Sequence, residues 1–101
     1  MTGLLAAVRE WRRAHAAEVL AGFADLLALA NVTGDVPALR RNAEEIVARL
    51  GARGVEAEAV GPDGVAPLVV GRVPGRPGAP RLGLYAHYDG QPVTPADWAT
   101  P

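Results

Sequence analysis

A segment that ends in His-x-Asp constrains the fold of this chain more than any other. Over residues 81–86, apolar side chains alternate with other residues, and this is the period of a β-strand. If the alternation continues past the strand end, Tyr85, His87 and Asp89 lie on one face. Gly90-Gln91-Pro92 then favours a turn. The sequence therefore predicts a strand that delivers an imidazole and a carboxylate at its C-terminal end.

The chemistry of this strand end favours a metal site. In open α/β sheets, ligands bind beyond the carboxyl ends of the strands. Imidazole is a good zinc ligand, and a nearby carboxylate can orient it. We therefore expect His87 to bind a metal and Asp89 to orient the imidazole. Because His-x-Asp is a weak pattern taken alone, a purely structural His87 is the alternative.

Two amphipathic helices are predicted upstream of this strand. Over residues 3–30, apolar residues recur at spacings of three and four, which is typical of one long helix. His15 lies on or near its apolar stripe, where packing is favoured over metal binding. Asp35 is a good N-cap, and Pro37 suits a first helical turn, so a second helix is expected over residues 36–53.

A β-hairpin is predicted between the second helix and the His-x-Asp strand. Residues 55–60 alternate apolar and acidic side chains, and residues 67–73 contain an apolar run. Gly61-Pro62-Asp63-Gly64 between them favours a turn. The order helix-helix-strand-strand-strand indicates an α/β layer structure with a mixed sheet. Because a strand as apolar as 81–86 needs more neighbours, we expect this sheet to be incomplete within residues 1–101.

The composition excludes several classes of function. The 101 residues fit one domain or part of one, and a net charge of -1 gives no electrostatic case for binding nucleic acid or an anionic membrane. The chain lacks cysteine and serine, which removes disulfides, thiolate ligands and both common nucleophiles. No apolar run reaches the length of about 18 residues that a membrane span needs. Without a convincing targeting segment, we expect a cytoplasmic protein.

The strand end resembles a known metal motif. It reads Leu84-Tyr85-Ala86-His87-Tyr88-Asp89-Gly90-Gln91-Pro92-Val93. This is similar to the first metal motif of the co-catalytic zinc metallopeptidases of metallopeptidase family twenty. That family includes dipeptidases, carnosinase, aminoacylase, carboxypeptidase G and succinyl-diaminopimelate desuccinylase. The upstream order is also similar, with Gly34-Asp35-Val36-Pro37 leading the second helix.

The resemblance implies a fold, a reaction and a partial site. The chain would be the N-terminal portion, residues 1–101, of an α/β/α sandwich catalytic domain. His87 is similar to a ligand of one of two zinc ions, or of other divalent metals, and Asp89 is similar to the carboxylate that orients it. The family hydrolyses the amide bond of a dipeptide or an N-acyl amino acid through a metal-bridging water. The complete enzyme can be a homodimer, and the fragment alone is expected to be inactive.

The sequence departs from the family pattern at three places. The remaining metal ligands and the general base cannot be located in residues 1–101. The usual Ile-Pro-Ser-like turn is replaced by Leu29-Ala30-Asn31-Val32-Thr33, and Ala86 stands where glycine is common. Two other functions therefore stay open: a non-catalytic α/β interaction module with a structural His87, and a different metal-dependent amidohydrolase.

Overall fold

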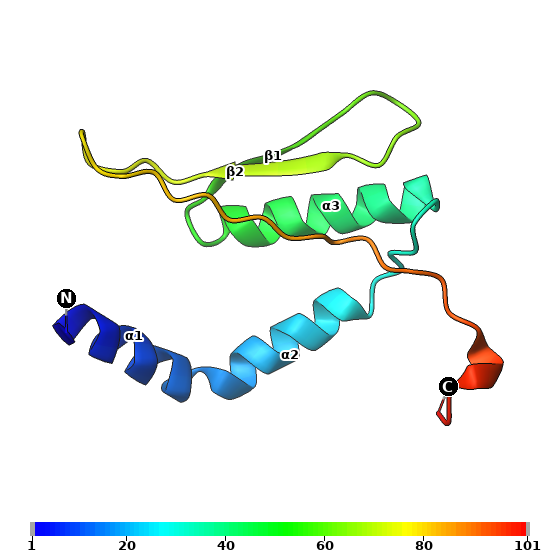
Figure 1. Cartoon of the computed structure of the whole chain (residues 1–101), viewed down its shortest axis with the longest axis horizontal. Helices are drawn as coiled ribbons and strands as arrows, with labels where there is room; N and C mark the ends of the chain where they lie inside the picture. The colour runs from blue at the N-terminus through cyan, green and yellow to red at the C-terminus, as the bar shows by residue number, and fades with distance from the viewer. Residues whose placement is uncertain (1, 101) are drawn as a thin grey trace.

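A central helix, with a β-hairpin on one side and two helices on the other, gives the chain its layout (Figure 1). The computed structural model describes residues 2–100. In Figure 1 a β-hairpin lies on one side of α3, and α1 and α2 lie on the other. The α/β class expected from the sequence is confirmed. The elements are α1 (Thr2–Ala14), α2 (Ala16–Leu27), α3 (Val36–Gly51), β1 (Glu56–Val60), β2 (Leu68–Arg72) and the 3-10 helix η1 (Pro95–Asp97).

Helix α3 holds the buried core of the described chain. The Asp35 carboxylate accepts a hydrogen bond from the Ala38 backbone N–H at 3.0 Å, and this confirms the expected N-cap. Gly54 adopts a φ of 78°, and the Val55 N–H returns to the Leu50 carbonyl at 3.0 Å. This left-handed closure ends the helix at Gly51, before the expected residue 53. The buried side chains of α3 are Ala38, Leu39, Asn42 and Ala43.

The expected hairpin is confirmed and packs on α3. Strands β1 and β2 pair antiparallel, with Glu58 opposite Val70. A Cβ atom at Gly71 would lie 3.1 Å from the Val55 side chain and 3.6 Å from the Leu50 side chain. The absence of a side chain at Gly71 therefore leaves room for the Val55 side chain, just before β1.

The single long helix expected over residues 3–30 is wrong, because the chain breaks at His15 into α1 and α2. The Trp11 carbonyl oxygen lies 3.0 Å from the His15 backbone nitrogen and 2.8 Å from the His15 Nδ1 atom. The two rings also stack, with centroids 4.2 Å apart. The His15 ring thus shares the Trp11 carbonyl with an intact backbone bond, and His15 itself leaves the helical region at φ -107° and ψ 14°. A side chain that bonds to the ladder is a known cause of helix kinks. The apolar spacing carries no sign of it.

The third strand and the mixed sheet are also corrected. Within residues 2–100, the sheet has two strands, both antiparallel, and residues 81–86 join no ladder. The segment instead passes α3 as an unpaired stretch (Figure 1), with Leu82 and Leu84 83% and 90% exposed. Alternation gives a segment the side-chain pattern of a strand, but a strand also needs a neighbouring backbone to pair with. No such neighbour lies beside it in the described chain.

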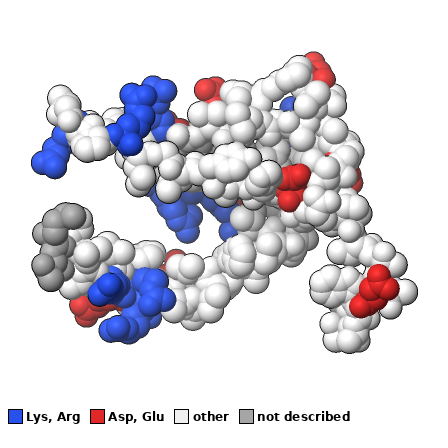
Figure 2. Space-filling view, in the orientation of Figure 1, with Lys and Arg blue, Asp and Glu red and all other residues white. Residues whose placement is uncertain are grey.

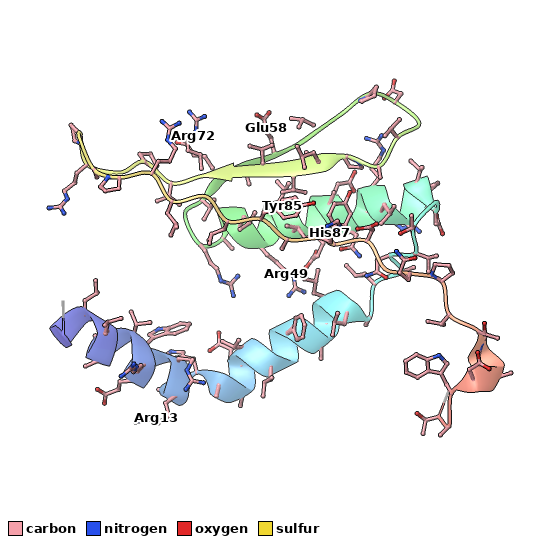
Figure 3. All side chains as sticks on the ribbon, in the orientation of Figure 1. Arg13, Arg49, Glu58, Arg72, Tyr85 and His87 are labelled. Carbon is pink, nitrogen blue, oxygen red and sulfur yellow. The ribbon has the colours of Figure 1, made fainter. Side chains whose placement is uncertain are left out.

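The molecule is spread out for its length. Its radius of gyration is 16.9 Å, whereas a compact domain of about 100 residues has about 13 Å. Arg49 connects α3 to α2 by donating to the Gly22 carbonyl oxygen at 2.6 Å (Figure 3). Figure 2 shows broad areas without charged residues between the scattered arginines and carboxylates. Many large apolar side chains are consequently exposed, among them Trp11, Phe23 and Leu84.

None of the helices within residues 2–100 combines the length and the apolar character that a membrane crossing requires.

Candidate functional site

Tyr85, His87 and Asp89 form one chain of hydrogen bonds. The Tyr85 hydroxyl lies 3.0 Å from His87 Nε2, and His87 Nδ1 lies 3.2 Å from Asp89 Oδ1. Figure 3 shows Tyr85 and His87 together on the extended segment that passes α3. The expectation that these three side chains share one face is confirmed, although the segment has no strand partners. The imidazole is therefore held at both of its nitrogens.

The acceptor character of Asp89 sets the tautomer of His87. An ionised carboxylate only accepts hydrogen bonds, so His87 Nδ1 must carry the proton that it shares with Asp89. In the neutral imidazole, Nε2 then has the free lone pair and accepts from the Tyr85 hydroxyl. The nitrogen that can bind a metal thus lies on the side of the ring away from the carboxylate. The His87 side chain as a whole is 70% exposed, and its Nε2 atom is bonded to the Tyr85 hydroxyl.

The two oxygens of the Asp89 carboxylate have different partners. Oδ1 accepts from His87, and Oδ2 accepts from the Thr33 hydroxyl at 2.9 Å. The Thr33 hydrogen bond, followed by that of His87, lowers the pKa of Asp89 below its ordinary value. Both donors stabilise the ionised form. Asp89 is consequently an anion at neutral pH, as an orienting carboxylate must be.

Tyr88, which lies between the two site residues, anchors the segment from the opposite side. Its hydroxyl donates to the carbonyl oxygen of Pro67, a buried residue just before β2. Partial burial, and secondarily the negative charge of Asp89, raises the pKa of the Tyr88 phenol, against a smaller opposing effect of Arg40. Tyr88 therefore stays protonated and keeps its hydrogen bond while His87 and Asp89 face solvent.

The loop of Asn31, Val32 and Thr33, which follows α2, holds the end of the segment. The Gly90 N–H donates to the Asn31 carbonyl at 2.7 Å, and the Thr33 N–H donates to the Gly90 carbonyl at 2.8 Å. These two bonds make a parallel bridge between Val32 and Gly90. Sequence reasoning treated residues 31–35 as a break and missed this role. A polar loop with Asn and Thr was the only available signal.

The side chains of the 31–33 loop add to the backbone bridge. Asn31 Nδ2 donates to the Tyr88 carbonyl at 3.2 Å, and the Thr33 hydroxyl also lies 3.0 Å from the Gly90 carbonyl. A Cβ atom at Gly90 would lie 2.8 Å from Asn31 Oδ1. A side chain at position 90 would therefore force Asn31 to shift, and the loop contacts each of residues 88, 89 and 90.

The donors at the site fit one zinc ligand with its orienting carboxylate. Imidazole Nε2 is a usual zinc-binding atom, and histidine ligands commonly donate their other N–H to a carboxylate. Across residues 2–100, no three His, Asp or Glu side chains gather into a metal-binding group. His15, the other histidine, is half-buried at the junction of α1 and α2 and bonds to Trp11. A complete zinc site therefore needs ligands in addition to His87.

Comparisons of the chain with protein-family models, with curated proteins and with solved structures find no match.

Proposed function

We propose that this chain is the N-terminal part of a dipeptidase-like zinc metallohydrolase, in which His87 binds one of two zinc ions. The observation that carries the proposal is the oriented imidazole, with Nδ1 on the Asp89 carboxylate and Nε2 turned away from it, on a side chain that is 70% exposed. The resemblance of residues 84–93 to the first metal motif supplies the reaction class. Metals in such sites acidify a bound water, whose pKa falls to about 7.

The roles of the chain's own residues follow from these contacts. His87 offers its Nε2 lone pair, and Asp89 holds the proton on Nδ1 so that this lone pair stays available. The Tyr85 hydroxyl now occupies the same nitrogen and has to turn away when a metal binds. The substrate by resemblance is a dipeptide or an N-acyl amino acid, hydrolysed in the cytoplasm. The remaining ligands and the general base are proposed to lie outside residues 1–101.

The alternative, an interaction module with a structural His87, is less well supported. A structural histidine is usually packed, whereas the His87 side chain is 70% exposed, with hydrogen bonds to Tyr85 and Asp89 and one edge-on ring contact with Tyr85 at 5.3 Å. His15, half-buried and stacked on Trp11, has the surroundings of a structural histidine. The contrast between the two histidines favours a ligand role for His87.

The test uses the complete natural polypeptide that carries this sequence. We expect His87→Ala to lower bound zinc and nearly abolish amide hydrolysis. Asp89→Asn should retain much of its zinc yet lose about 10–100-fold in rate, the typical effect of losing an orienting partner. His15→Ala is the matched control and should keep both properties. Equal zinc content and turnover in the parent and the His87 variant would show the proposal to be wrong.

The isolated 101-residue chain is a second test. One histidine ligand cannot hold two zinc ions, so purified chain supplied with zinc should hydrolyse no dipeptide. Zinc-dependent turnover by this material, abolished by chelation, would overturn the proposal that further ligands lie elsewhere. Stable binding of a peptide ligand by the zinc-free chain, unchanged by His87→Ala, would instead favour the interaction module.

A further inference from the structure

We propose that Thr33 is a positioning residue that acts through Asp89 on the imidazole of His87. Its relevance to metal binding depends on the proposed function above, but its effect on the imidazole does not. Thr33 is 56 residues away from Asp89 in the sequence, and their side chains are hydrogen bonded at 2.9 Å. The contact thus joins the loop after α2 to the candidate metal ligand.

The backbone fixes where the Thr33 side chain can reach. The Gly90 N–H and carbonyl are both used by the 31–33 loop, at 2.7 Å and 2.8 Å. A residue paired through both of its backbone groups has little freedom to slide along its partner. Since Asp89 directly precedes Gly90, its carboxylate is kept within reach of the Thr33 hydroxyl.

The side-chain contacts then fix the orientation of the carboxylate. Thr33 Oγ1 has one proton and two acceptors within reach, Asp89 Oδ2 at 2.9 Å and the Gly90 carbonyl at 3.0 Å. Asp89 Oδ1 meanwhile accepts from His87 Nδ1 at 3.2 Å. A carboxylate bound at both oxygens cannot rotate freely. Thr33 therefore sets the plane of the carboxylate and, through it, the direction of the imidazole.

The alternative is that Thr33 only holds the segment in place and does not orient the Asp89 carboxylate. The backbone bridge, the Asn31 side chain and the Tyr88 hydroxyl already hold residues 88–90 in position. Removing only the Thr33 hydroxyl should leave that position intact and free the carboxylate to rotate. The consequence should appear at the nitrogens of His87, where a purely structural role of Thr33 predicts no change.

The experiment measures the imidazole nitrogens of the 15N-labelled full chain by NMR. It is done without metal, at a pH well above the ordinary histidine pKa of about 6.5. In Thr33→Val, which keeps the side-chain shape, we expect the His87 signals to shift away from the Nδ1–H tautomer. Thr33→Ser should restore them. Thr94→Val is the matched control, because Thr94 makes no side-chain cap bond at η1, and should match the parent.

Amide signals of residues 31–33 and 88–90 report whether the loop stays in place. If Thr33→Val loses the loop contact altogether, Thr33→Ala, which also lacks the hydroxyl but is smaller, takes its place in the comparison with the parent and Thr33→Ser. Parent-like His87 nitrogens in Thr33→Val, with the loop in place, would overturn the proposal. So would a Thr33→Ser variant that keeps the loop but shifts the nitrogens as fully as Thr33→Val does.

A zinc titration of the same samples separates this inference from the proposed function. We expect Thr33→Val to weaken zinc binding at His87 by up to about tenfold, the lower end of the loss typical for an orienting partner. Equal affinity in parent and Thr33→Val would overturn the relevance of Thr33 to metal binding and leave the zinc ligand in place. A tautomer shift in Thr33→Val, in a chain whose His87 binds no zinc, would support the positioning role and count against the proposed function.

Discussion

The Thr33 hydroxyl donates to Asp89 Oδ2 at 2.9 Å, and the same carboxylate accepts from His87 Nδ1 through its other oxygen. This shared carboxylate connects two segments that lie far apart in the sequence. The loop after α2 and the end of the extended segment form one polar site through the Val32–Gly90 bridge, although residues 81–86 join no sheet in the described chain.

We predict that the pKa of Asp89 depends on the Thr33 hydroxyl. Because the Thr33 hydrogen bond is the largest cause of its lowered pKa, Thr33→Val should raise that pKa towards the ordinary aspartate value. A lowered folded-state pKa means that the contact stabilises the chain above the unfolded-state pKa and is lost as the pH falls through the folded-state value. The carboxyl 13C shift of Asp89, followed from neutral to acid pH, measures both effects. An unchanged midpoint in Thr33→Val would contradict the assigned cause.

The N-cap of α3 provides a stability prediction. Asp35→Ala removes the acceptor of the Ala38 N–H and should lower the free energy of unfolding by about 1 kcal/mol. Urea unfolding followed by far-UV circular dichroism measures the change. Asp63→Ala is the control, since the Asp63 side chain makes no hydrogen bond within residues 2–100. Equal losses in both variants would show that the cap contributes nothing specific.

Gly90 should tolerate a side chain much less well than Gly83. A Cβ atom at position 90 would lie 2.8 Å from Asn31 Oδ1, whereas one at position 83 meets no atom within 4 Å. Gly90→Ala must therefore move the Asn31 side chain, which makes the bond to the Tyr88 carbonyl. We expect faster hydrogen exchange at the Thr33 and Gly90 amides in Gly90→Ala and parent rates in Gly83→Ala. Unchanged protection in Gly90→Ala would contradict the close contact.

The exposed segment should make the chain self-associate. Leu82 and Leu84 are 83% and 90% exposed on a stretch without backbone partners, and unpaired apolar strands of this kind promote association. Sedimentation velocity should show species larger than a monomer as the concentration rises. Replacing both leucines by lysine should favour the monomer, and the control with Thr94→Lys and Thr100→Lys should not. A parent chain that stays monomeric at high concentration would contradict this prediction.

Local signals in the sequence were enough to predict α3 and the hairpin. Asp35 and Pro37 mark a helix start by capping chemistry, and the Gly61–Gly64 turn follows from backbone preferences. The kink at His15 was not predictable from apolar spacing, because it depends on one side chain competing for the Trp11 carbonyl. The prediction of a third strand was wrong for a different reason, because alternation describes the two faces of a strand and says nothing about its neighbours.

Only the residues of the candidate site that lie close together in the sequence were predictable. Tyr85, His87 and Asp89 are spaced by two residues, so their common face follows from backbone geometry. The contributions of Asn31 and Thr33 bridge more than fifty residues and depend on how the chain returns past α3. No period or motif in the sequence records such a contact.

A zinc titration of the labelled 101-residue chain tests the central claim most directly, with the two histidines compared in one sample. His87 has a carboxylate on Nδ1 and a side chain that is 70% exposed, whereas His15 is half-buried and bonds to a backbone carbonyl. We predict that the His87 nitrogens respond at a zinc concentration at least about tenfold below that needed for His15, and that Asp89→Asn removes most of this difference. Equal responses of the two histidines, or a response of the chain that His87→Ala leaves unchanged, would contradict the account.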